Sequence, residues 1–187
     1  MNVKFLREFY IPLLVLLAIV LIAGFYTYLV VSKNNINNTI LTPAQSALSV
    51  DAGGTPYTDL EGNIILLSDY IGQVIVVNSW ASWSPASVTE LATIAKMSAE
   101  FRDNEVKFLA INRSEPANTA ISFIETYKIS KEITFILDHD DRFYKRIEGY
   151  NMPETVIYDR EGNVFHHERG SISASKLRKL VNQALAI

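Results

Sequence analysis

The chain has 187 residues, 49% of them hydrophobic, with a formal net charge of −3 and no cysteine. This length leaves room for one domain with its own core and an accessory segment. Its slightly acidic balance and scattered basic residues exclude the basic face typical of nucleic-acid binding. The absence of thiols excludes disulfides, thiolate catalysis and thiolate metal sites in the chain as it stands.

The first predicted element is a membrane-spanning helix at residues 9–31. No charged residue occurs between Phe9 and Ser32, and aromatic residues stand near both ends of this apolar run. About 20 helical residues cover the roughly 30 Å of a bilayer core. Lys4 and Arg7 precede the run, so the positive-inside rule predicts a single-pass anchor with a cytoplasmic N-terminus at residues 1–8.

A cleaved signal peptide is the alternative for the N-terminus, because its start is short and basic. The apolar run is long for a signal core, however, and the nearest small-residue cleavage pattern, residues 44–46, lies well beyond it. We therefore expect an uncleaved anchor. Residues 32–55 are rich in Asn, Ser, Thr, Gly and Pro and are predicted to be a flexible linker.

Residues 56–187 are predicted to form one extracytoplasmic domain, periplasmic or on the outer surface. Its patterns alternate between buried strands and amphipathic helices, and Gly-Asn turns mark two hairpins. The expected elements, in chain order, are a hairpin at 57–67, a strand at 73–78, a helix at 85–101, a strand at 106–111, a helix at 118–127, a strand at 134–137, a helix at 142–148, a strand at 155–158 with its hairpin turn at 159–163, and a helix at 173–186. This alternation predicts an α/β fold with a central mixed sheet flanked by helices.

Two stretches carry a resemblance to a known family. The strand VIVVNSWASW runs into a proline-bearing turn and helix, and GYNMPETVIYDREGNV follows about 65 residues later. In order and spacing these resemble the membrane-anchored thioredoxin-like proteins of the TlpA, ResA and DsbE (CcmG) type. The resemblance covers residues 55–187 and implies a thioredoxin-like fold with an added N-terminal hairpin.

The family exchanges thiols and disulfides outside the cytoplasm, often in cytochrome c maturation or envelope disulfide control. The resemblance places Ser84 and Ser87 at the two positions of its Cys-x-x-Cys motif, Pro153 at its cis-proline and Glu90 at an acidic position after the second cysteine. Ala92 departs from the pattern, since many relatives have a helix-kinking proline there. Serine forms no disulfide, so the chain as written cannot perform the family's redox cycle.

The two serines have a structural interpretation of their own. Serine is a favoured N-cap and proline a favoured first helical residue, so Ser84-Pro85 is expected to begin a helix with a side-chain cap. Ser87 and Glu90 also fit a capping-box pattern in a competing frame. We expect helix capping rather than catalysis at both serines.

A serine hydrolase site is the alternative catalytic interpretation, and it requires a histidine base. His166 and His167 are adjacent in a strand and point to opposite faces. His139 lies in Asp138–Asp141, which is read as a polar turn capping the next helix rather than as a metal loop. We expect no triad, no metal site and no cofactor.

A shallow groove for an extended partner segment is implied instead, since backbone pairing beside Pro153 needs no sulfur. Trp80 is expected in the core, whereas Trp83 is either a packing residue or a binding residue. The residues assigned to this partner groove are Trp83, Pro85, Met152, Pro153 and Glu154. The expected function is a membrane-tethered binding or scaffolding module; the alternative is a thiol-disulfide oxidoreductase whose two cysteines have been replaced by serine.

Overall fold

The computed structural model describes residues 24–25, 54, 56–102 and 105–187. The predicted anchor at 9–31 and linker at 32–55 lie outside these residues, apart from Gly24, Phe25 and Gly54. Within the described stretches no helix is both long and apolar enough to cross a bilayer. Contacts divide the chain into two units, Met1–Leu41 and Thr42–Ile187, and the fold below is that of the second.

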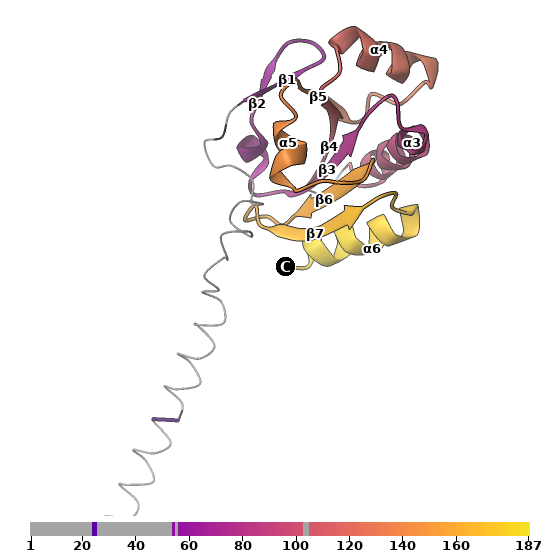
Figure 1. Ribbon diagram of the computed structural model, residues 1–187. Coiled ribbons are helices and arrows are strands. Elements are labelled where there is room, and N and C mark those ends of the chain that lie inside the picture. The colour runs from indigo at the N-terminus through magenta and orange to yellow at the C-terminus, as the bar shows by residue number, and fades with distance from the viewer. Residues whose placement is uncertain (1–23, 26–53, 55, 103–104) are drawn as a thin grey trace, which may run out of the picture. The chain divides into compact units, whose positions relative to one another are not determined.

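The described residues form one mixed sheet of seven strands in the order β2-β1-β5-β4-β3-β6-β7 (Figure 1). The central strands β3, β4 and β5 are parallel, whereas β1, β2, β6 and β7 pair antiparallel with their neighbours. The predicted mixed sheet is confirmed. The strand bounds are β1 Tyr57–Asp59, β2 Ile64–Ile65, β3 Val74–Trp80, β4 Val106–Arg113, β5 Thr134–Asp138, β6 Glu154–Tyr158 and β7 Val164–Arg169.

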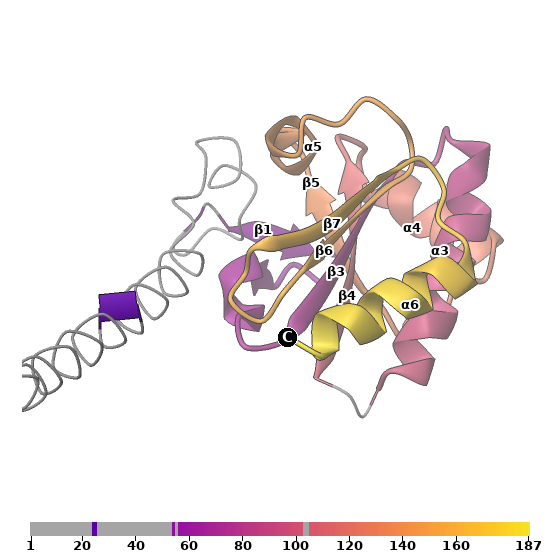
Figure 2. The same ribbon diagram turned by 90° about the horizontal axis from the view of Figure 1, so that it is seen from below.

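Helices cover both faces of the sheet. The helices α3 (Pro85–Glu100), α4 (Ala117–Thr126) and α6 (Ala174–Leu185) pack on one face, and the 3-10 helix η1 (Leu67–Tyr70) and the short α5 (Arg142–Arg146) pack on the other (Figure 2). Every predicted helix is present, and its ends differ from the prediction by no more than two residues. The exposed Ala92 interrupts nothing, because α3 runs continuously from Pro85 to Glu100.

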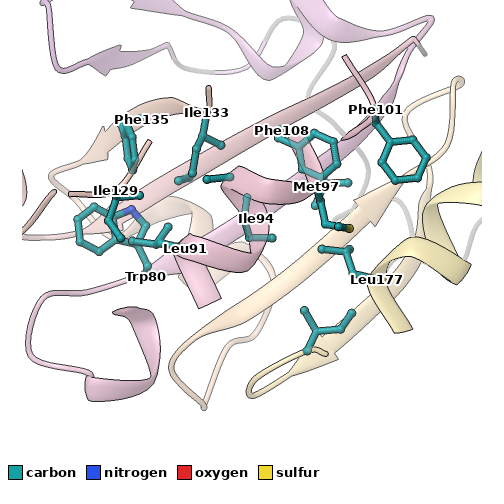
Figure 3. Packing of buried hydrophobic residues seen from close by; sticks show 14 of the residues in the cluster. Trp80, Leu91, Ile94, Met97, Phe101, Phe108, Ile129, Ile133, Phe135 and Leu177 are labelled. Atoms are coloured by element: carbon teal, nitrogen blue, oxygen red, sulfur yellow. The ribbon is translucent and has the colours of Figure 1, made fainter. Parts of the chain in front are cut away.

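The core on the α3 side is built around β3, whose seven residues are all buried. Trp80 is fully buried and lies 5.2 Å from Phe123, ring centre to ring centre. Figure 3 shows Leu91, Ile94 and Met97 of α3 filling the space beside this strand, among residues of β4 and α6. Because apolar residues fill both faces of β3, the end of this strand is held rigidly, and the turn that follows it starts from a fixed position.

Both predicted hairpins are present and share one turn chemistry. The Asp59 carboxylate accepts hydrogen bonds from the backbone N–H groups of Glu61 and Asn63 at 3.0 and 2.7 Å. Asp159 accepts the corresponding bond from Asn163 at 2.8 Å. The glycine in each turn has a φ near +80°, a conformation that costs other residues more.

The polar turn after β5 begins α5, as predicted. The capping group is Asp138, whose carboxylate accepts from the backbone N–H groups of Arg142 and Phe143 at 3.0 and 2.8 Å. Asp138 is buried, whereas His139 and Asp140 are exposed. The buried Asp138 thus caps α5, and Arg113 also holds the turn through two hydrogen bonds to Asp141 at 2.7 and 2.6 Å.

Candidate functional site

The site begins at the motif turn, residues 81–84, which joins β3 to α3. A backbone bond from Ser84 N–H to Ala81 O, 3.1 Å long, closes this turn. Trp80 before the turn belongs to the core, as predicted, whereas the Trp83 side chain is 62% exposed. Trp83 therefore makes little contact with the core, and its ring is accessible at the surface beside the motif turn.

Ser84 occupies the N-cap position of α3, but the expected side-chain cap is wrong. Its side chain makes no capping hydrogen bond. The hydroxyl donates instead to the carbonyl oxygen of Met152, 3.1 Å away and 68 positions along the chain. The side chain is buried and faces the loop that precedes β6, so the hydroxyl bonds to this loop and not to the N–H groups at the start of α3. Ser84 therefore ties the motif turn to a distant loop.

The capping box expected at Ser87 and Glu90 is also wrong. Ser87 is fully buried, and its hydroxyl oxygen accepts a long hydrogen bond, 3.4 Å, from the backbone N–H of Ala81. The backbone N–H of Ser87 donates to Ser84 O at 3.0 Å, so this N–H group of the first helical turn already has a backbone acceptor. Helix α3 already starts at Pro85, and Ser87 lies within its first turn.

Glu90 points into the protein instead of toward the helix start. One carboxylate oxygen accepts from Thr155 Oγ1 at 3.0 Å and from Asn78 Nδ2 at 3.3 Å. The other accepts from the backbone N–H of Ile172 at 3.0 Å. Burial without a cationic partner raises the pKa of Glu90, and these hydrogen bonds offset the rise only in part. Glu90 is a buried acid behind the motif turn.

The second wall of the site is the cis-proline loop, residues 149–153. The Met152–Pro153 peptide bond is cis, at the position that the resemblance assigns to the family's cis-proline. Met152 is half-buried and Pro153 is buried. The hydrogen bond from Ser84 reaches this loop, so the structure brings together Ser84, Met152 and Pro153 as the resemblance implies.

Glu154 was assigned to the groove, and this assignment is wrong, because its side chain is completely buried. One carboxylate oxygen accepts from the backbone N–H groups of Tyr150 and Asn151 at 2.8 and 2.7 Å. The other lies 2.7 Å from Nε2 of His167. Burial lowers the pKa of His167, although its bond to Glu154 acts in the opposite direction. Glu154 holds the cis-proline loop from beneath.

A third carboxylate fixes the motif turn, and the sequence offered no signal for it. Glu115, in the loop after β4, accepts hydrogen bonds from the backbone N–H of Ser82 at 2.8 Å and from the Ser82 hydroxyl at 2.5 Å. Asn112 donates to the same carboxylate at 2.7 Å. The turn is therefore held both from β4 and from the cis-proline loop, and Trp83 projects from a rigid support. A hollow of about 450 Å³ runs from Ser82 of the motif turn along the exposed face of α4.

Tyr150 and Arg169 are the other residues that were missed. The Tyr150 side chain is 70% exposed at the cis-proline loop. The guanidinium carbon of Arg169 lies 5.0 Å from the centre of its ring. Tyr150 is recognisable in the sequence only as a neighbour of Met152, and Arg169 reaches it because β7 pairs Arg169 with Glu154.

The arrangement offers little for hydrolytic chemistry. The Ser84 hydroxyl bonds to a carbonyl oxygen, whereas His166 and His167 bond to Glu168 and Glu154. The two histidines point to opposite faces of β7, as predicted. Among the described residues, no group of three or more acidic or histidine side chains could hold a metal ion.

A mixed sheet whose third strand leads into a helix-starting turn opposite a cis-proline defines a thioredoxin-like protein. Consistent with this, a thiol:disulfide interchange protein of the thioredoxin family from Chlorobium tepidum superimposes with a TM-score of 0.63, covering 73% of this chain and 97% of the other at 17% identity. The Redoxin family model matches residues 32–183, and the chain belongs to this family.

Two of the similar curated proteins are named as thiol-disulfide proteins. The thiol-disulfide oxidoreductase ResA of Halalkalibacterium halodurans is 24% identical over 126 residues, which are 66% of this chain and 69% of ResA. The thiol:disulfide interchange protein DsbE of Allochromatium vinosum is 31% identical over 104 residues, 56% of this chain and 55% of DsbE. The chain thus spans about half the length of that second relative.

Proposed function

We propose that this protein is a membrane-tethered, extracytoplasmic member of the Redoxin family that binds extended segments of partner proteins and performs no thiol-disulfide exchange. The observation that carries the proposal is the state of positions 84 and 87. Both carry hydroxyls engaged in internal hydrogen bonds, while the surrounding fold and cis-proline loop are intact.

The chemistry of serine supports the loss of redox activity. Thiol-disulfide exchange needs a thiolate that attacks a disulfide sulfur and passes through a mixed disulfide. The start of a helix lowers the pKa of a thiol enough to supply that thiolate, but a serine hydroxyl ionises far too weakly to benefit. Ser84 and Ser87 are also both buried, so neither presents a free nucleophile.

Binding needs none of this chemistry. An extended peptide can pair through its backbone beside a loop such as 149–153, and exposed side chains on either side then add affinity. Trp83 and Tyr150 are exposed aromatic groups flanking the Ser84–Met152 bond, on supports fixed by Glu115 and Glu154. Rigid aromatic groups bind at a small entropic cost.

Membrane tethering is supported by the sequence alone. The uncharged residues 9–31, preceded by Lys4 and Arg7, fit a single-pass anchor that leaves the domain outside the cytoplasm. A flexible segment at 32–55 would then let the groove reach partners at a distance from the bilayer.

One observation favours a second candidate, a thiol-disulfide oxidoreductase of the cytochrome c maturation or envelope disulfide type whose two cysteines have been replaced by serine. Ser84 and Ser87 stand one helical turn apart, and the buried Glu90 lies behind them, which is the arrangement that the resemblance implies for the family's redox motif. The natural gene decides between the candidates. Cysteine codons at 84 and 87 would establish the second one, and serine codons would leave the binding module.

The binding proposal is tested with an unfolded protein that has no free thiol, reduced and carboxamidomethylated α-lactalbumin. We expect the full chain to bind it and Trp83→Ala to weaken the affinity at least about tenfold, as is usual for a central aromatic residue. Ile64→Ala, which truncates a side chain that is 72% exposed on the hairpin, is the matched control and should leave the affinity unchanged. Equal affinities for the native chain and Trp83→Ala would contradict the proposed groove.

A further inference from the structure

Arg169 ends β7 directly beside the cis-proline loop. It pairs in register with Glu154, and the next residue, Gly170, donates its backbone N–H to Pro153 O at 3.0 Å. The pairing of β6 with β7 therefore fixes the backbone of Arg169 next to the cis-proline loop.

The guanidinium group of Arg169 lies against an exposed aromatic ring. Its distance of 5.0 Å from the Tyr150 ring centre fits a cation–π contact. Tyr150 is in turn held by the bond from its backbone N–H to Glu154. Such a contact leaves the guanidinium N–H groups that do not face the ring free to donate to a ligand.

No acidic side chain in the described part of the chain pairs with Arg169. Glu154, its register partner, is buried and already bound by two backbone N–H groups and His167. Glu168, its neighbour in the chain, points to the other face of β7 and pairs with Lys176 and His166. Arg169 is thus an exposed cation held against Tyr150, and among the described residues it has no acidic partner.

We propose that the segment bound in the groove carries an aspartate or glutamate that pairs with Arg169, while its neighbouring residues lie across Met152 and Trp83. This inference rests on the proposed binding function and specifies its ligand. Trp, Tyr and Arg are the residue types that most often dominate binding energy at interfaces. Trp83 directly precedes Ser84, and Tyr150 and Arg169 lie at the cis-proline loop that Ser84 contacts. A carboxylate can accept two parallel N–H bonds from one guanidinium group, which supplies the selectivity.

The test uses the full chain and an oriented library of acetylated, amidated octapeptides without cysteine. We expect the native chain to enrich Asp and Glu at one position of the bound peptides, next to positions that favour apolar residues. Arg169→Gln should abolish the acidic enrichment and leave the apolar preference. Arg178→Gln is the matched control, because Arg178 pairs with Glu100 on the exposed side of α6 and should not change the selection.

Affinities for one selected peptide and its Glu-to-Gln counterpart complete the test. We expect the native chain to prefer the acidic peptide about tenfold, and Arg169→Gln to bind both within twofold, since one charge-assisted bidentate pair is lost. If the native chain binds both peptides equally, the acidic ligand is wrong while the groove stands. If it selects no peptide, the binding function fails with it. Thermal unfolding of each variant confirms that the fold is retained.

Discussion

The site rests on two buried glutamates, one beneath each wall, and they differ in the groups that donate hydrogen bonds to them. Glu90 lies under the motif turn and accepts hydrogen bonds from Thr155, Asn78 and the backbone of Ile172, and no cationic side chain in the described part of the chain bonds to it. Glu154 lies under the cis-proline loop and accepts two backbone N–H groups and a bond from a histidine ring. Burial raises the pKa of Glu90 and favours its neutral form, whereas the carboxylate of Glu154 organises the backbone of the cis-proline loop around it.

The largest effect should come from removing the organising carboxylate. We expect Glu154→Ala to lower the free energy of unfolding by about 3 kcal/mol, because two backbone donors and His167 lose their buried partner at once. Urea unfolding at pH 7 measures this. Glu125→Ala, at an exposed position of α4, should change stability by no more than about 0.5 kcal/mol. A loss below about 1 kcal/mol for Glu154→Ala would show that water replaces the carboxylate.

The effect of Glu90→Gln should be smaller and should depend on pH. An amide of the same size keeps an acceptor for Ile172, so we expect a change of no more than about 1 kcal/mol at neutral pH. The folded pKa of Glu90 is raised above its ordinary value of 4.5, so the folded state holds its proton to higher pH than the unfolded chain does. The stability of the native protein should therefore fall as pH rises from 4.5 through the raised pKa. Glu90→Gln should lack this component, and parallel pH curves would contradict the assignment.

The smallest effect should come from His167, with the opposite slope. Burial lowers its folded pKa below the ordinary value of 6.5, so the unfolded chain takes up a proton first as pH falls. Its stabilising contribution is present above pH 6.5 and is lost as pH falls through the lowered pKa. We expect unfolding curves of the native protein between pH 7 and 5 to show this loss and those of His167→Gln to lack it. If both proteins lose stability equally over this range, another group is responsible.

Much of the fold could be predicted because local chemistry repeats at fixed spacings. The Asp-x-Glu-Gly-Asn turns, the all-apolar run of β3 and the amphipathic stripes of the helices each depend on neighbours within a few positions. The hairpins and helix ends therefore agree with the structure. The motif turn and the cis-proline loop were recognised as partners through a family resemblance, and local pattern alone does not connect residues that far apart.

The roles of individual side chains were harder to predict, because alternative partners compete for the same group. Ser84 precedes a proline as an N-cap serine does, yet its hydroxyl donates to the carbonyl oxygen of Met152. Glu90 has the spacing of a capping box, yet the interior offers it three donors. Glu154 directly follows Met152 and Pro153 in the chain, but side chains alternate between the two faces of a strand, and that of Glu154 points into the protein. Glu115 and Arg169 carried no sequence signal, since both act on segments distant in the sequence.

The sequence by itself determined the element types, the turn chemistry and the absence of sulfur at positions 84 and 87, because these depend on residue identity and short-range spacing. Only the tertiary structure decided which carboxylate supports which wall, that the serines bond within the protein, and that Arg169 lies against Tyr150 at the cis-proline loop. Those relations arise where strands far apart in the chain pair in a fixed register, and that register depends on the packing of the whole sheet.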